Sequence, residues 1–375
     1  MSETQKHTKP NVPNLRFPGF SGEWKNCTLG QLGDIKGGGT PDTLTNKYWN
    51  GGIQWFTPSE IGKTKYVRKS ERTISSDGLS NSSAKLLPPK SILLSSRATV
   101  GECSINLEEC CTNQGFQSFV PNTLVESEFL YYRLLTHKKE LIRKACGSTF
   151  LEISAKQIGS IPSSIPERKE QEKIVSFLSL IDEHISIQSK VIEKYESLIK
   201  ALAYETIGKY TPNTLLSECV RCSSSTLKES DLAEEGAVPA YGAAGISGFT
   251  DSALSDEDSI LITKDGSGFG SLRYVNGPHS FVGTLNSMTP KEGVYLPYIY
   301  YALQNVCFES YRTGQAIPHI YFKDYGKETI YCPSLDNQKR LAKGLEMIDT
   351  KIGIDRAVLQ SLQSAKAYLL SAMFI

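Results

Sequence analysis

Apolar residues recur every three or four positions over two long stretches of the chain, which is the spacing of one face of an α-helix. The first stretch, QEKIVSFLSLIDEHISIQSKVIEKYESLIKAL, covers Gln171–Leu202 and contains neither Gly nor Pro. The second covers Gln338–Leu369, near the end of the 375-residue chain. Both alternate steps of four and three residues, which is the a/d seam of a coiled coil. We therefore predict one long helix over 166–207 and another over 333–375.

The two helical stretches belong to an internal repeat. When the chain is shifted by 167 residues, Gln171 and Asp182 coincide with Gln338 and Asp349. The predicted seam positions are Ile174, Leu178, Ile181, Ile185, Gln188, Ile192, Leu341, Leu345, Ile348, Ile352, Asp355 and Leu359. Since neither helix can bury its seam alone, we expect the two to form an antiparallel coiled coil. The two polar members of the seam either fix the register of the pair or face solvent where the seam drifts.

The segments that precede the helices are rich in β-branched and aromatic residues and in Gly, Pro, Asn and Ser, which is typical of short strands and tight turns. SILL at Ser91–Leu94 matches SILI at Ser259–Ile262 at a shift of 168, whereas Thr28–Thr40 matches Thr214–Thr226 at a shift of 186. The first copy is therefore 18 residues longer between these landmarks. We predict an α+β chain with an internal pseudo-twofold repeat. Its parts are a flexible tail over 1–14, β-rich domains over 15–165 and 208–332, and the long helices over 166–207 and 333–375.

Composition is ordinary, with 39% hydrophobic and 22% charged residues and a formal net charge of +1. No apolar run approaches the roughly 20 residues that span a bilayer, and the first residues lack the apolar core of a signal peptide, so we expect a cytoplasmic protein. The nine cysteines lack a zinc-site spacing and are expected to be reduced thiols. Residues 1–90 carry 13 Lys and Arg against 7 Asp and Glu, whereas 208–333 carry 9 against 14. Any nucleic-acid binding must therefore use local patches.

The sequence contains no complete catalytic motif. Gly62-Lys63-Thr64 lacks the upstream glycine of a P-loop, and Gly266–Gly270 lacks the third glycine of the dinucleotide fingerprint. An Asn/Asp-Pro-Pro-aromatic segment, a Gly-x-Ser-x-Gly elbow and a His-Glu-x-x-His motif are also missing. A twofold repeat without such motifs favours a binding or scaffolding protein with no catalytic or metal site.

A succession of short segments is more specific than any single motif. These segments are LRFPGFSGEW (Leu15–Trp24), GGGTPDT (Gly37–Thr43), YWNGGIQWFTPSEI (Tyr48–Ile61), SSRATVGECSI (Ser95–Ile105), TNQGF (Thr112–Phe116) and PERKEQEKI (Pro166–Ile174). Together with the half-chain repeat, they resemble the specificity subunits of Type I restriction–modification systems. The second half departs from that pattern, with Ser223–Ser225 in place of the glycines at Gly37–Gly39.

The resemblance implies that each globular domain reads one half of a bipartite DNA target, while the paired helices set the spacer and dock two methyltransferase subunits. Restriction–translocase subunits are the other implied partners. S-adenosylmethionine, ATP and Mg are expected on those partner subunits, with no cofactor and no catalysis in this chain. Two other classes stay open. One is a methyltransferase- or nuclease-associated enzyme with a fused recognition domain, and the other is a coiled-coil adaptor that does not bind DNA.

Base reading needs hydrogen-bonding side chains at groove edges, and phosphate binding needs Lys and Arg. The candidates in the first domain are Lys36, Thr40, Lys63, Lys65, Arg68 and Arg97. Those in the second domain are Arg221, Thr226, Lys264, Arg273, Arg312 and Lys323. Each is equally compatible with a solvated surface side chain. The glycines between Lys36 and Thr40 are expected to let the backbone approach a duplex, whereas the aromatic residues of Tyr48–Phe56 are expected in the core.

Overall fold

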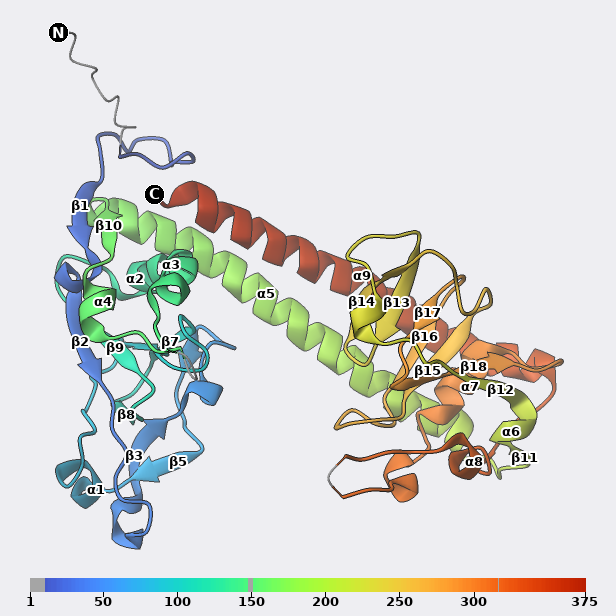
Figure 1. Cartoon of the computed structure of the whole chain (residues 1–375). Coiled ribbons are helices and arrows are strands. Elements are labelled where there is room, and N and C mark those ends of the chain that lie inside the picture. The colour runs from blue at the N-terminus through green and yellow to red at the C-terminus, as the bar shows by residue number, and fades with distance from the viewer. Residues whose placement is uncertain (1–10, 148–150, 316) are drawn as a thin grey trace. The chain divides into compact units, whose positions relative to one another are not determined.

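The structure is a computed structural model that describes residues 11–147, 151–315 and 317–375. It divides into two compact units, each with strands and helices of its own (Figure 1). Unit 1 comprises Met1–Ser186 and Gln360–Ile375, and unit 2 comprises Ile187–Leu359. Each long helix therefore contributes one stretch to each unit, whereas the sequence analysis placed the helices outside the globular domains. We call the part of a unit outside the long helices its body.

The two long helices begin directly after proline-marked loops, as the sequence predicts. Helix α5 covers Arg168–Ala203 and continues into a π-helical turn, and helix α9 covers Leu335–Met373. In unit 1 the Nζ of Lys366 on α9 lies 2.5 Å from a carboxylate oxygen of Asp182 on α5. In unit 2 Arg356 on α9 makes an ion pair with Glu196 on α5, at 2.6 Å. The helices thus pack against each other within both units.

The residues of the predicted seam are all buried or half-buried, and none of them is exposed. Leu178 is fully buried, and Leu345 and Ile352 are each 2% exposed. Burying such a side chain stabilises the folded state by about 1.5–3 kcal/mol. The polar members meet, because the side-chain Nε2 of Gln188 donates to the backbone oxygen of Asp355 at 3.2 Å. Asp355 is only 4% exposed, which favours a register-fixing contact over a solvent-facing one.

The body of unit 1 contains two sheets and a pair of terminal strands. The five-stranded sheet has the order β2 (Gly33–Gly37), β9 (Gln117–Pro121), β6 (Ile92–Leu94), β7 (Cys103–Asn106) and β4 (Tyr66–Val67). The three-stranded sheet has the order β5 (Arg72–Ile74), β3 (Trp49–Phe56) and β8 (Cys110–Thr112). The terminal strands β1 (Lys25–Thr28) and β10 (Pro162–Ile165) pair antiparallel. The helices are α1 (Ser76–Ser80), α2 (Ser127–Thr136), α3 (Lys138–Lys144) and α4 (Ala155–Gly159).

The body of unit 2 repeats this topology. Its larger sheet has the order β12 (Val220–Ser224), β18 (Leu285–Pro290), β15 (Ser259–Thr263) and β16 (Leu272–Val275). Its smaller sheet has the order β14 (Gly245–Thr250), β13 (Val238–Gly242) and β17 (Ser280–Phe281). Strands β11 (Thr214–Leu215) and β19 (Thr329–Ile330) form the terminal pair. The helices are α6 (Leu216–Cys219), α7 (Leu296–Leu303) and α8 (Phe322–Tyr325).

The 18 additional residues of the first copy lie between the equivalent strands β3 and β6. In unit 1 that interval holds β4, β5 and α1, whereas the corresponding interval of unit 2 holds β14 alone. Strand β4 therefore has no counterpart among the strands described in unit 2, and it forms the edge of the larger sheet of unit 1. The length difference that the sequence shows is an added edge strand and a short helix on a shared frame.

Both ends of the chain contribute to unit 1. Phe374 is 6% exposed and packs its ring edge-to-face against Trp24, with 6.2 Å between ring centroids. The backbone nitrogen of Leu15 donates to Ala372 at 2.9 Å. Most of the predicted tail, residues 1–10, lies outside the described residues. Asn11 hydrogen-bonds Trp24 through its backbone and its side chain, so residues before the predicted boundary at residue 15 already contact the body of unit 1.

Candidate nucleic-acid interface

A buried glutamine connects the body to the start of the long helix in each unit. Gln171 accepts a hydrogen bond from the backbone nitrogen of Glu126 at 2.8 Å and donates to the carbonyl of the proline before α5 at 3.0 Å. Gln338 accepts from the backbone nitrogen of Tyr295 at 2.8 Å and donates to the proline carbonyl before α9 at 2.8 Å. The two residues that coincide in the sequence repeat thus perform the same structural task.

A tyrosine–aspartate hydrogen bond recurs in the same way. The hydroxyl of Tyr132 on α2 donates to Asp182 on α5 at 2.6 Å, and that of Tyr301 on α7 donates to Asp349 on α9 at 3.2 Å. Burial raises the pKa of both phenols, so they act as neutral donors. Burial also raises the pKa of Asp349. These repeated contacts hold each body on the long helices.

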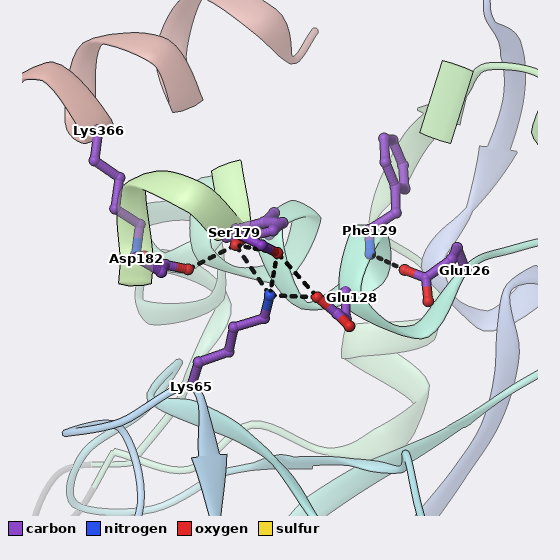
Figure 2. Close-up of polar contacts among 8 residues, drawn as sticks. Lys65, Glu126, Glu128, Phe129, Ser179, Asp182 and Lys366 are labelled. Atoms are coloured by element: carbon purple, nitrogen blue, oxygen red, sulfur yellow. Dashed lines mark hydrogen bonds and ion pairs between the residues drawn. The ribbon is translucent and has the colours of Figure 1, made fainter. Parts of the chain in front are cut away.

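Lys65 has a structural role that the sequence analysis did not predict. Figure 2 shows its ammonium group directed at Glu128 on α2 and Ser179 on α5. It forms an ion pair with Glu128 and donates to the Ser179 hydroxyl at 2.8 Å, and its side chain is only 8% exposed. The prediction that Lys65 contacts DNA is therefore wrong, because its charge is buried and already paired. Its position just before β4 makes it part of the added segment of unit 1.

The glycine run of the first domain is a packing feature. A Cβ added to Gly38 would lie 2.0 Å from the backbone oxygen of Asn113, and one added to Gly39 would lie 2.2 Å from the Ser83 hydroxyl. The indole nitrogen of Trp55 also donates to the Gly39 oxygen at 2.9 Å. These glycines allow neighbouring segments of the body to approach each other. Internal packing therefore explains the glycine run, and the predicted approach of the backbone to a duplex is not needed to explain it.

Three of the four aromatic side chains predicted in the core of this region are buried, and the fourth, Tyr48, is half-buried against them. Trp49, Trp55 and Phe56 are 8%, 4% and 1% exposed. The two indoles pack edge-to-face with centroids 5.1 Å apart, and the Arg72 guanidinium carbon lies 3.6 Å from the Trp49 ring centroid. Their faces are therefore not available for stacking on bases.

The other candidate residues lie at or near the surface, and the predicted DNA contacts remain predictions. Four arginines form exposed or half-exposed ion pairs: Arg68 with Glu108, Arg97 with Glu152, Arg221 with Glu257, and Arg312 with Glu309. Two basic side chains lie near aromatic rings: Arg273 near Tyr241, and Lys323 near Tyr321. The hydroxyl of Thr40 donates to Gln114. The remaining candidates are Lys36 and Lys264, which are half-buried, and Lys63 and Thr226, which are exposed.

Two acidic residues and a histidine that the sequence analysis did not select lie beside these candidates. Glu152 pairs with Arg97, and Asp265 pairs with His319 at the corresponding place in unit 2. They were missed because partners in a loop cannot be identified without the fold. Across 11–147, 151–315 and 317–375, no group of three or more His, Cys, Asp or Glu side chains could hold a metal ion. Within the same ranges, no helix has the length and apolarity to cross a membrane.

The fold and these contacts define a duplicated α+β protein in which two similar bodies are mounted on a shared pair of long helices. The family described as "Type I restriction modification DNA specificity domain" matches residues 21–197 and 220–364, so the chain belongs to this family and contains two copies of its domain. The predicted family and α+β class with an internal repeat are therefore confirmed.

Individual relatives agree with this assignment. The chain is 33% identical to the Type I restriction enzyme MjaIX specificity subunit of Methanocaldococcus jannaschii over 180 residues, or 47% of this chain and 42% of that protein. It is 23% identical to the EcoprrI specificity subunit of Escherichia coli over 88% of both chains. The alignments with the first two curated relatives cover only 42% and 50% of their lengths. Among solved structures, the Type I S subunit from M. genitalium is similar over 97% of this chain and 99% of its own, with a TM-score of 0.57 at 21% identity.

Proposed function

We propose that this chain is the DNA-recognition subunit of a Type I restriction–modification complex. Each body reads one half of a bipartite target, and the paired helices set the spacer between the halves. The observation that carries the proposal is the duplicated specificity domain, whose two copies share a frame and differ in their exposed side chains. A protein with two such bodies can read two unrelated half-sites.

The chain itself performs no chemistry in this proposal. Two methyltransferase subunits dock on the outer faces of the long helices and carry S-adenosylmethionine, and restriction–translocase subunits carry ATP and Mg. The complex works in the cytoplasm, where the DNA is. Large apolar side chains are exposed on both long helices, among them Leu180 in unit 1 and Ile187 and Ile354 in unit 2, and a docked subunit could cover them.

Much of the phosphate binding is assigned to the docked subunits, because the segment 208–333 is acidic, with 9 Lys and Arg against 14 Asp and Glu. The isolated chain should therefore bind DNA weakly and gain affinity when methyltransferase subunits bind. Equal affinity with and without them would contradict this division of labour.

Methylation-aware sequencing of a host with and without the chain tests the main proposal. The expected result is that one split methylated motif is present only in the host that contains the chain. An unchanged methylation pattern would favour an adaptor that does not bind DNA. Methylation by the purified chain alone, with DNA and methyl donor, would favour an enzyme.

A further inference from the structure

The loop that follows the central strand has the same backbone construction in both units. In unit 1 the backbone nitrogen of Gly101 donates to Ser95 at 3.0 Å, and in unit 2 that of Gly270 donates to Thr263 at 2.8 Å. Ala98 of unit 1 has a left-handed φ of 58°, at the place where unit 2 has Gly266 with a φ of 86°. A left-handed conformation is uncommon for a residue with a Cβ, so the loop shape is held at some conformational cost in unit 1.

A second segment of each body is fastened to this loop by equivalent hydrogen bonds. In unit 1, the backbone nitrogen of Ile153 donates to Ser96 at 3.1 Å. In unit 2, that of Ile320 donates to Lys264 at 3.0 Å. The repeated frame therefore places residue 97 beside residue 152 and residue 265 beside residue 319.

The side chains on this common frame are inverted in charge. Unit 1 has Arg97 on the loop, and its Nη2 lies 2.9 Å from a carboxylate oxygen of Glu152. Unit 2 has the acidic residue Asp265 on the loop, in contact with the ring Nδ1 of His319. Arg97 and Glu152 are 45% and 42% exposed, so both can reach a ligand. Asp265 and His319 are half-buried, with side chains 28% and 24% exposed. A frame shared by two bodies, with oppositely charged residues at the same loop position, is what readers of different bases require.

The two loop residues, Arg97 and Asp265, can form hydrogen bonds with different bases. A guanidinium has five donors in a fixed fork, and an ion pair through one nitrogen orients the fork while leaving donors free. Such a fork matches the O6 and N7 acceptors of guanine in the major groove. A carboxylate only accepts, and it matches the amino group of cytosine or adenine. Resting on the function proposed above, we propose that Arg97 reads a guanine in the half-site of unit 1 and that Asp265 makes unit 2 read an amino-bearing base.

The test uses the full chain, expressed with its own methyltransferase partner in a host that lacks the chain, followed by methylation-aware sequencing. Arg97→Ala should remove the requirement for guanine at one position of one half-site. Discrimination at that position should fall by roughly 10- to 100-fold, the usual effect of losing one bidentate base contact, while the other half-site keeps its sequence. Asp265→Ala should relax one position of the other half-site only.

Arg143→Ala is the matched control, because Arg143 is also an exposed arginine in unit 1 paired with a glutamate, Glu140, at 3.7 Å, and it is not among the candidate DNA-binding residues. It should leave the motif unchanged. Weaker methylation by Arg97→Ala with an unchanged motif would identify a phosphate contact and overturn the proposal. Complete loss of methylation would also overturn it, whether the variant melts normally or is destabilised. If the unmodified chain produces no bipartite motif, the proposed function fails, and this result is distinct from the other outcomes.

Discussion

The buried ion pair between Arg16 and Glu170 should be one of the strongest single contacts in unit 1. Arg16 Nε and Nη2 lie 2.7 Å from the two carboxylate oxygens of Glu170, which is 1% exposed, and the Arg16 side chain is 15% exposed. The hydrogen bond to Glu170 raises the pKa of Arg16, so the guanidinium stays charged. The indole of Trp24 adds only a long hydrogen bond to Glu170, at 3.4 Å. Removing the arginine therefore leaves a buried carboxylate almost without a partner.

Arg16→Met should lower the free energy of unfolding by about 3–5 kcal/mol, the usual cost of breaking a buried pair from one side. The double variant Arg16→Met/Glu170→Leu should lose much less, because no unpaired charge remains. Urea titrations followed by tryptophan fluorescence give these values for unit 1 specifically, since Trp24, Trp49 and Trp55 are the three tryptophans of the chain and all belong to that unit.

Arg68→Met is the control, because its ion pair with Glu108 is exposed and should contribute no more than about 1 kcal/mol. Equal losses of unfolding free energy in Arg16→Met and in Arg16→Met/Glu170→Leu would show that the packing of these side chains, and not the ion pair, causes the loss. A loss for Arg16→Met as small as that for Arg68→Met would refute the argument from burial.

Four further predictions concern the helices and the body. Leu178→Ala, at a fully buried seam position, should cost about 2–5 kcal/mol by the same fluorescence assay, whereas Leu180→Ala, at a position 56% exposed, should cost almost nothing. Lys65→Met should destabilise unit 1 without changing the methylated motif, and a changed motif would show that Lys65 does contact DNA. Burial lowers the pKa of His137 to about 4, below its value near 6.5 in the unfolded chain. The neutral ring therefore contributes up to about 3 kcal/mol to stability above pH 6.5, and this contribution is lost as the pH falls toward 4. His137→Phe should flatten the plot of unfolding free energy, measured by urea titration, against pH over that range, and an unchanged slope would contradict the assignment. Insertion of seven residues after Ser186 and of seven after Leu359 keeps the seam in phase and lengthens each helix by about 10 Å. The spacer of the methylated motif should then grow by about three base pairs. An unchanged spacer would show that helix length does not set the spacer.

The long helices and the repeat were predictable because their signals are local and periodic. The seam from Ile174 to Ile192 recurs at positions that lie on one face of a helix, and its copy 167 residues later supplied the packing partner. Coincident polar residues such as Gln171 and Gln338 were visible as a repeat, although their hydrogen bonds were not. The β-rich bodies followed from composition and turn residues, but their strand order did not, because it depends on contacts between distant segments.

The candidate site was less predictable, since the fate of a charged side chain depends on what packs around it. Lys65 and Arg68 are three residues apart in one segment, yet one is 8% exposed with its charge neutralised and the other is 58% exposed. Gly38 and Gly39 have the local pattern of a flexible loop, whereas distant neighbours make them close-packing positions. The inversion of Arg97 and Asp265 became visible only when the two bodies could be matched strand by strand.

The central claim is that each body reads one half of a bipartite target on a pseudo-twofold frame. Replacing Thr214–Ile330 by Cys27–Ser163 would give a chain with the body of unit 1 in both places, joined at residues that pair with each other in the terminal strands of each unit. Methylation-aware sequencing of a host with this chain and its methyltransferase partner is the most direct test. The account predicts a palindromic motif made of two inverted copies of one original half-site. Retention of the original asymmetric motif would contradict it.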